Sequence, residues 1–508
     1  MFGTAIAVGT IYVVVHLIRD LQEVRNPSVL PFVLLALALF VALGFEFVNG
    51  FHDTANAVAT VIYTRSLDPQ IAVVWSGAWN FAGVLFSSGV VAFGIISLLP
   101  VDLILQVGTT SGFAMVFALL VAAIIWNLGT WYLGLPSSSS HTLIGSIIGV
   151  GIANQLLVPG SSTSSVDWNQ AIGVGKSLLI SPIVGFLCAG SLLLIAKVLV
   201  PRRELYVSPS SAAPPPLWIR LLLILTCTGV SFAHGSNDGQ KGMGLIMLIL
   251  IGTVPTTYAL NRAVSPERIP HFVSLSAEAA AVLASRADSS VTVDEPRAQV
   301  AAFLQSHAVR PQTIPAVRAM IEEVASELAR YKELRDVPPE RVPNFRNDLY
   351  VVNEALHLLE AAPSPRLVGA HDASVIHEYR QQIDLTTKFI PDWVKVAVAI
   401  ALGLGTMIGW KRIVITVGEK IGKDHLTYAQ GAAAEITAMA TIGAADMFGL
   451  PVSTTHVLSS GVAGTMAANR SGLQWNTIRN LLMAWVLTLP VSIVLSATLF
   501  WLFRTLAL

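Results

Sequence analysis

Long apolar runs separated by short polar links cover most of this chain. An α-helix needs roughly 18 to 20 apolar residues to cross a membrane, so runs of this length predict transmembrane helices. Because backbone groups in lipid must pair within their own span, we expect an all-α polytopic membrane protein with about ten to twelve such helices. The runs lie near residues 3–18, 29–64, 70–99, 112–133, 138–158, 171–200, 217–234, 238–255, 391–410, 426–447, 452–468 and 477–506.

The composition supports a lipid environment. Of 508 residues, 54% are hydrophobic and 12% are charged, whereas soluble domains are about 25% charged. The net charge is zero, which gives no reason to expect a nucleic-acid partner. Cys188 and Cys227 lie in apolar runs, so they predict small core side chains rather than a disulfide or a metal site. The first run follows no basic residue, which favours an additional N-terminal helix within residues 1–28 over a signal peptide.

One segment, residues 261–388, has a different character. It contains 14 Lys/Arg and 17 Asp/Glu, which is half of all charged residues in the chain. Its spacing of apolar residues is helical, as in VRAMIEEVASELARYKELRDV. We therefore predict a soluble helical insertion whose charges form a solvated face.

Two short basic loops indicate the orientation. Residues 201–220 and 409–425 are both rich in Lys and Arg, and such loops are usually cytoplasmic. If 217–234 and 238–255 are two crossings, the insertion lies on the same side as the first loop. If they form a single crossing, it lies on the opposite side.

A polar motif occurs twice within the apolar runs. GFEFVNGFHDTANA (44–57) aligns without gaps with GVSFAHGSNDGQKG (229–242). The alignment pairs Asn49 with His234, Gly50 with Gly235, Asp53 with Asp238, and Asn56 with Lys241. In both copies the polar residues recur at i, i+4 and i+7, which is one face of a helix.

A second motif is also duplicated. GLPSSSSHTLIGSIIG (134–149) aligns with GLPVSTTHVLSSGVAG (449–464). The two motif pairs are offset by 185 and 315 residues, and the difference of 130 is close to the length of the insertion. Such a duplication is typical of transporter folds built from repeats. We divide the chain into a helix at 1–28, a first repeat at 29–200, a linker at 201–216, a second repeat at 217–260 and 389–508, and the insertion at 261–388.

Charged residues inside a membrane need compensation. An ion near the bilayer centre costs about 2.5–3.5 kcal/mol on insertion scales. Asp53, Asp238 and Lys241 must therefore have partners, or the carboxylates must bind a proton or a cation. The alternative for Asp238 and Lys241 is a buried ion pair that only fixes helix packing.

The second motif predicts an anion site. Pro favours the first turn of a helix and Ser or Thr caps its free N–H groups, so each copy indicates a chain break followed by a helix start. A helix start in a membrane cavity can hold a tetrahedral oxyanion such as phosphate or sulfate. The alternative is that the hydroxyls only cap the helices. The candidate hydroxyls are those of Ser137, Ser138, Ser139, Ser140, Thr142, Ser453, Thr454 and Thr455.

An aspartate beside an oxyanion repels it unless a proton or cation is bound as well. The two motifs together therefore predict coupled binding of an anion and a cation. Histidines near the motifs could titrate, donate to the anion or bind a metal, or could be ordinary core residues. Polar residues within the apolar runs are further candidates for this anion and cation site. They are His52, Asn80, His141, His234, Asn237, Glu435 and His456.

Four stretches resemble the duplicated signatures of the PiT family of inorganic phosphate transporters. They are NGFHDTANAVATVIYTR, FAHGSNDGQKG, GLPSSSSHTLIG and GLPVSTTHVLSSGVAGTM, and the polar insertion makes the bacterial low-affinity members the most similar. The resemblance implies inverted repeats, with broken helices at a site near the membrane middle. It implies that phosphate is held by Ser139, Ser140, Ser453, Thr454 and Thr455. It places the coupling cation or proton near Asn49, Asp53, Asn56 and Asp238. Glu435 matches an acidic position implicated in that family's phosphate transport, so we group it with these coupling residues.

The bacterial branch of this family is proton-coupled and takes phosphate as a complex with a divalent metal, whereas other members use sodium. His52 and Thr54 depart from the commoner signature. Lys241 stands where the first copy has Asn56, and a lysine there disfavours sodium. We therefore expect a proton symporter that imports phosphate across a bacterial inner membrane, with no permanently bound cofactor, and a homodimer is compatible with it.

Alternatives remain at this stage. A sodium symporter or a sulfate permease could share the fold, and a channel could share the spans. An intramembrane metalloenzyme could use the histidines and aspartates as ligands, but no HExxH motif or nucleophile-with-base pattern supports an enzyme.

Overall fold

We describe the protein from a computed structural model. The described residues are 2–22, 29–53, 55–96, 98, 109–157, 168–209, 214–287, 291–361 and 370–507. Within these ranges every element is helical, apart from an isolated bridge between Gly422 and Leu473. The all-α prediction is confirmed.

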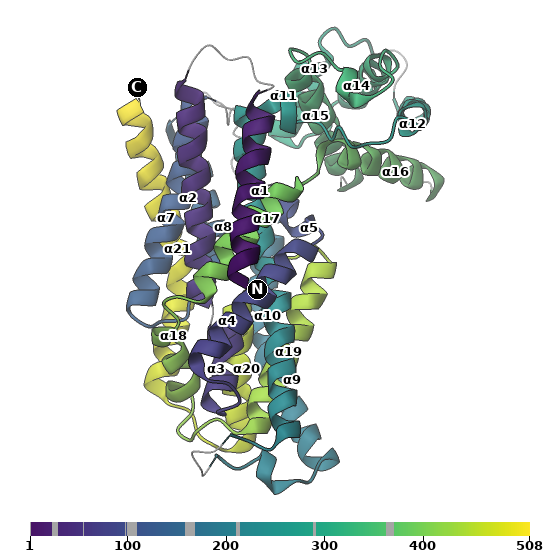
Figure 1. Cartoon of the computed structure of the whole chain (residues 1–508). Helices are drawn as coiled ribbons and strands as arrows, with labels where there is room; N and C mark the ends of the chain where they lie inside the picture. The colour runs from purple at the N-terminus through teal and green to yellow at the C-terminus, as the bar shows by residue number, and fades with distance from the viewer. Residues whose placement is uncertain are drawn as a thin grey trace.

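The first half of the membrane part follows the predicted apolar runs (Figure 1). Its helices are α1 (Phe2–Gln22), α2 (Leu30–Asp53), α3 (Ala55–Tyr63), α4 (Pro69–Phe86), α5 (Val90–Ile96), α7 (Thr110–Tyr132), α8 (Ser139–Leu157) and α9 (Trp168–Leu199). The short turn η1 (Arg203–Leu205) follows in the linker. α1 lies on the outside of the bundle, where Gly9 faces Ile400 of α17.

The second half begins with α10 (Leu217–Thr253) and resumes after the insertion. Its later elements are α17 (Asp392–Thr406), α18 (Lys411–Ile415), the π-helical η3 (Thr416–Lys420), α19 (Tyr428–Met447), α20 (Thr454–Asn469) and α21 (Trp475–Ala507). The short α11 (Pro255–Tyr258) follows α10 and leads into the insertion. The insertion contains α12 (Arg268–Ala284), α13 (Pro296–Ser306), α14 (Thr313–Leu328), η2 (Leu334–Asp336), α15 (Val342–Ala361) and α16 (Ala370–Thr387).

Seven of the described helices are long and apolar enough to cross a membrane. The number of candidate membrane spans rises to nine if each of two bent helix pairs counts as one span. This count is lower than the predicted ten to twelve. One reason is that the run at 452–468 forms only the 16-residue α20, which is too short to cross a bilayer alone. A second reason is that α10 is a single helix.

Of the two alternatives for 217–234 and 238–255, two crossings are therefore wrong, and the structure contains a single helix. α10 has 37 residues without a break, which corresponds to about 55 Å at 1.5 Å per residue. The chain consequently enters the insertion at the opposite end of the molecule from the 201–216 linker (Figure 1). The linker lies beside the second basic loop, since Ser208 donates a 3.2 Å hydrogen bond to the carbonyl of His425.

Helices of the first half pack against helices of the second half in a symmetric pattern. α9 packs against α20 while α8 packs against α21, and α4 packs against α10 while α2 packs against α17. If α2, α4, α8 and α9 are exchanged with α10, α17, α20 and α21, respectively, each of these contacts becomes another contact of the same set. α2 begins at the end of the molecule where α10 ends (Figure 1). The inverted relation of the repeats stays a prediction.

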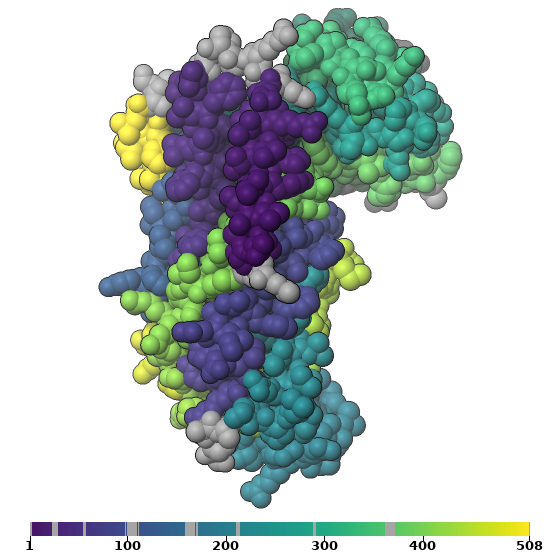
Figure 2. Space-filling model, viewed as in Figure 1, coloured from purple at the N-terminus to yellow at the C-terminus, as the bar shows by residue number. Residues whose placement is uncertain are grey.

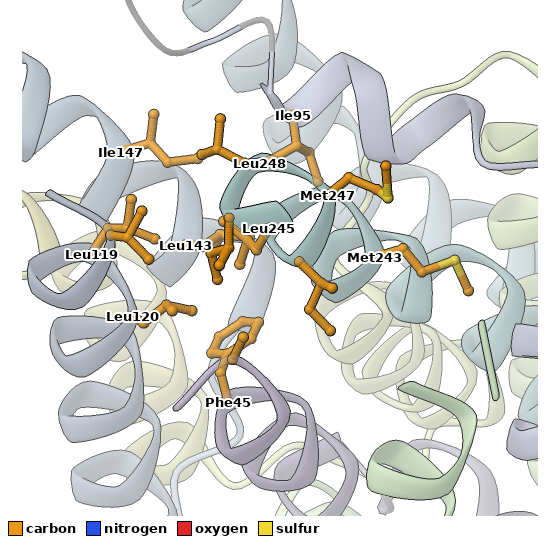
Figure 3. Close-up of a cluster of buried hydrophobic side chains, with 14 of the residues drawn as sticks. Phe45, Ile95, Leu119, Leu120, Leu143, Ile147, Met243, Leu245, Met247 and Leu248 are labelled. Carbon is orange, nitrogen blue, oxygen red and sulfur yellow. The ribbon is translucent and has the colours of Figure 1, made fainter. Parts of the chain in front are cut away.

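Three hydrophobic cores organise the molecule. One fills the membrane part nearest the insertion and includes Phe45, Leu119, Leu143 and Leu248 (Figure 3). A second core, at the end with the basic loops, joins α3, α18 and α20 with the first turns of α10. The third belongs to the insertion.

The insertion packs as a separate helical body beside one end of the bundle (Figure 2). Its core contains Phe272 and Tyr379, and burial raises the pKa of the Tyr379 hydroxyl. Its two ends meet, because the backbone N–H of Asn261 donates a 2.8 Å hydrogen bond to the carbonyl of Thr386.

Candidate functional site

Each Gly-Leu-Pro motif is a chain break followed by a helix start, as its residues predict. Gly134 and Gly449 end the preceding helices with φ of 67° and 66°, a conformation that favours glycine. The hydroxyl of Ser138 then accepts from the N–H of His141 at 3.2 Å, and the hydroxyl of Ser453 accepts from the N–H of His456 at 3.1 Å. These serines are matched N-caps of α8 and α20.

The starts of α8 and α20 converge on Asp53, the last residue of α2. Ser139 donates to one carboxylate oxygen at 3.2 Å, and Thr455 donates to the other. The Nδ1 atom of His52 lies 3.1 Å from the same carboxylate. Asp53 is 2% exposed, so a single buried carboxylate receives hydroxyls from both duplicated motifs.

The middle of α10 supplies the opposite charge. The Nζ atom of Lys241 lies 2.7 Å from the Asp238 carboxylate and also donates to the hydroxyl of Ser140. Ser140 in turn donates to the carbonyl of Val452 at 2.8 Å. Lys241 is fully buried, and the predicted Asp–Lys pair exists within the site itself.

His234 bridges the two aspartates. Its Nε2 atom lies 3.5 Å from Asp238 and 3.9 Å from Asp53, while its Nδ1 atom lies 2.8 Å from the amide oxygen of Asn80. One ligand atom each from Asp53, His234 and Asp238 lie within 4.8 Å of one another. Oxygen and imidazole ligands at this spacing can hold a proton or a metal cation.

Glu46 is a site residue that our reading of the sequence missed. Its carboxylate is fully buried on α2, and Asn49 donates to one of its oxygens at 3.5 Å. A Cβ atom added at Gly242 would lie 2.5 Å from its other oxygen, so Glu46 faces the same stretch of α10 as Lys241. An acid within the apolar run 29–64 was the available signal.

A hydroxyl network supports His52. Its Nε2 atom lies 3.1 Å from the hydroxyl of Thr130 and 3.4 Å from that of Ser137. The two hydroxyls lie 2.9 Å apart. Ser137 therefore contacts a histidine at the site, and Thr130 is a second residue that the sequence motifs did not indicate.

The matched histidines of the second motif meet behind the helix starts. The rings of His141 and His456 are 4.7 Å apart, and the ring of Trp485 stacks on His456 at 4.1 Å. Among the described residues, the His141 Nδ1 and His456 Nε2 atoms have no hydrogen-bond partner. These rings link the two repeats directly.

Several predicted residues lie outside this cluster. Glu435 accepts hydrogen bonds from Thr60 of α3 and Thr226 of α10. Since Thr226 precedes Asp238 by twelve residues, Glu435 lies about 18 Å along α10 from the aspartate. The hydroxyl of Thr142 donates back to the carbonyl of Ser138.

The remaining candidates have these positions. Asn237 donates at 3.3 Å to the carbonyl of Leu450, in the link that precedes α20. Thr454 is buried at the start of α20. The side chain of Asn56 lies outside the described residues.

The polar cluster separates the two membrane cores. On α10, residues up to Ala233 belong to one core and residues from Met243 belong to the other. The polar residues lie between them, near the middle of the bundle. An ion at this cluster would be enclosed by apolar packing towards both ends.

The family model described as "Phosphate transporter family" matches residues 49–496. The chain belongs to this phosphate transporter family. The low-affinity inorganic phosphate transporter PitA of Escherichia coli K12 is 41% identical over 486 residues, which cover 92% of this chain and 96% of PitA. A probable low-affinity inorganic phosphate transporter of Bacillus subtilis is 28% identical, over 92% of this chain and 96% of its own length.

A solved structure gives a further match to this PiT-family transporter. The chain titled "The sodium-dependent phosphate transporter" is 19% identical, with a TM-score of 0.52, and the match covers 93% of our chain and 99% of that one. At this identity the match shows a common fold. Because the relatives are named as transporters, the metalloenzyme alternative is set aside, and the apolar helices make the chain a multi-pass membrane protein.

Proposed function

We propose that this protein imports inorganic phosphate across a bacterial inner membrane by proton symport. The observation that carries the proposal is the position of Asp53, whose carboxylate accepts hydroxyl groups from the starts of both α8 and α20. Helix starts bind oxyanions. Phosphate and an ionised Asp53 cannot share these donors without strong repulsion.

Coupling follows from that repulsion. A proton on Asp53 removes its charge and releases Ser139 and Thr455 to donate to phosphate. Phosphate and proton therefore favour each other's binding, which is the requirement for symport. The enclosure by two apolar cores strengthens this effect, because charges interact more strongly away from water.

Lys241 favours protons over sodium as the coupling ion. Its ammonium group already neutralises Asp238 at 2.7 Å, so a second cation at that carboxylate would meet like charge. When Asp53 carries no proton, its carboxylate and His234 are available as ligands for a divalent metal that enters with phosphate as cargo. The sodium-dependent relative of the same fold makes sodium the alternative to be tested.

Phosphate is favoured over sulfate by the same carboxylate. Near neutral pH phosphate retains a proton and can donate a hydrogen bond, whereas sulfate cannot. The carbonyl oxygen of a protonated Asp53 can still accept a hydrogen bond, and Glu46 is a second buried acceptor in the cluster. An acceptor that a ligand cannot satisfy is penalised, so the site discriminates against sulfate.

The test is uptake of labelled phosphate by liposomes that contain the purified protein. We expect phosphate uptake with a proton gradient in the absence of sodium, no uptake of labelled sulfate under the same gradient, and the background level of phosphate uptake for Asp53→Asn, which keeps the shape but cannot exchange a proton.

A matched control is Asp20→Asn on α1, where the carboxylate accepts from the hydroxyl of Tyr258 instead of facing the site. This variant should transport normally. Uptake that requires sodium would contradict proton coupling, and uptake of sulfate in place of phosphate would contradict the substrate.

A further inference from the structure

A cavity of about 620 Å³ lies between the insertion and the membrane part. On the insertion side it is lined by α15 and α16, and on the membrane side by the link from α4 to α5, by α5 itself and by Gly449. Figure 1 shows α5 directly beneath the insertion. This volume is within the range of small-molecule sites.

Arg346 of α15 is the unusual group in this cavity. It is 7% exposed, and burial lowers the pKa of its guanidinium. Its contacts are the ring of Tyr350 at 5.0 Å and a 3.4 Å hydrogen bond to Asn347. Its Nε atom has no hydrogen-bond partner, and within the described part of the chain no carboxylate forms an ion pair with it. A buried guanidinium normally has such a partner.

The other charged residues that line the cavity do not form an ion pair with Arg346. The carboxylate of Asp384 is held by Lys388 at 2.8 Å and by the amide of Asn353 at 2.9 Å. Glu354 also lines the cavity but forms no ion pair with Arg346. Within the described part of the chain, the charge of Arg346 is thus not neutralised by a carboxylate, although the residue lines the cavity.

A second cavity in the insertion shows the contrast. Its volume is about 630 Å³, and its arginines are paired. Arg297 lies 2.7 Å from Glu323 and 2.8 Å from Asp348, and Arg341 lies 2.9 Å from Glu327. These carboxylates satisfy the guanidinium groups, so this second cavity has no comparable capacity for an anion.

The first cavity also adjoins the transport site. Gly449 lies on its membrane side and begins the link that leads through Pro451 and Ser453 into α20. A Cβ atom at Gly449 would lie 2.6 Å from Val90 of α5, so this link and α5 are in close contact. An anion at Arg346 would therefore lie on the insertion side of the helix start that we assign to phosphate.

We propose that Arg346 and the cavity around it form a second oxyanion site, in which phosphate is captured before it reaches the transport site. A guanidinium matches phosphate with paired hydrogen bonds, and Tyr350 holds the guanidinium plane. This inference rests on the proposed transport of phosphate.

The first test compares uptake kinetics of Arg346→Gln and Arg318→Gln. Both remove one arginine from the insertion, but Arg318 is exposed and paired with Glu322. Loss of a charge-assisted contact is expected to raise the KM for phosphate about tenfold with little change in maximal rate. Arg346→Lys should give an intermediate KM, and Arg318→Gln should match the unmodified protein.

A second test does not require transport. Ser88 is an exposed residue that lines the cavity, so Ser88→Cys in a Cys188→Ser background introduces a thiol there. Phosphate should slow the reaction of this thiol with an anionic methanethiosulfonate, and Arg346→Gln should abolish the protection. Sulfate is the parallel probe and should protect as well, because a guanidinium binds either oxyanion.

The outcomes separate the two proposals. Normal phosphate uptake with an unchanged KM in Arg346→Gln, and no protection of the thiol, would overturn the capture site alone. A lower maximal rate together with a lower unfolding temperature, at constant KM, would assign Arg346 a structural role and overturn it too. Absence of phosphate uptake by the unmodified protein would overturn the transport proposal, while thiol protection would still report on the capture site.

Discussion

Lys241 shows how a single residue can set the chemistry of a duplicated site. The repeat aligns it with Asn56, so the two halves supply an amide and an ammonium at matched positions. The ammonium pairs with Asp238 and reaches Ser140. The chain itself therefore neutralises one aspartate of the matched pair, which leaves Asp53 as the aspartate that we propose responds to the coupling ion.

Lys241→Asn should change the ion requirement. Removing one member of a buried ion pair costs about 3–5 kcal/mol, and Asp238 will recover part of this by binding a cation. We expect uptake driven by protons alone to fall at least about tenfold and sodium to restore part of it. Lys423→Asn, at an exposed lysine, is the control. Uptake indifferent to sodium in Lys241→Asn would contradict this role.

At the scale of elements, glycines set the crossings between the halves. A Cβ atom at Gly50 of α2 would lie 2.3 Å from the carbonyl of Leu402 in α17. At Gly235 of α10, which the repeat aligns with Gly50, it would lie 2.2 Å from the carbonyl of Asn80 in α4. Both helices thus touch backbone to backbone immediately beside the site residues.

Gly50→Ala and Gly235→Ala should each destabilise the protein by about 1–3 kcal/mol, because the added methyl group has no space. Gly44→Ala on α2 is the matched control, since no atom of the described residues lies within 4 Å of its added Cβ, and it should be neutral or slightly stabilising. Thermal unfolding in detergent measures the difference. Equal unfolding temperatures for all three variants would argue against tight crossings.

The sequence predicted some elements better than others for local reasons. The starts of α8 and α20 follow from capping chemistry that neighbouring residues supply, and the structure contains both. The sequence left open whether α10 is continuous, because polar residues and glycines separate its two apolar runs. The glycines serve for close packing, as Gly239 does against Val84. Glu435 was grouped with Asp53 by its apolar surroundings, but only tertiary packing decides which hydroxyl groups reach it.

At the scale of the whole molecule, the unbroken α10 determines on which side the insertion lies. The two basic loops are together at one end, and the insertion is at the other. Loops rich in Lys and Arg stay on the cytoplasmic side. We therefore expect the insertion, and the cavity beneath it, to face the exterior, which is the side from which the proposed import would take phosphate.

Thiol labelling tests this orientation in a Cys188→Ser background, in which the remaining Cys227 is buried. A membrane-impermeant maleimide should label Ser274→Cys, on exposed α12, in intact spheroplasts. It should label Glu204→Cys, in the basic linker, only after permeabilisation. The reverse pattern would place the insertion in the cytoplasm and remove the capture site from the side of uptake.

The contact between Asn261 and Thr386 has a consequence for how such a transporter evolves. Because the chain leaves and rejoins the membrane part at one point, and the insertion has its own core, a gene could gain, lose or exchange this segment as a cassette. Mutations that affect substrate capture could then accumulate in the insertion while the duplicated membrane helices stayed unchanged. Affinity for scarce phosphate and turnover would be separately heritable traits of one polypeptide.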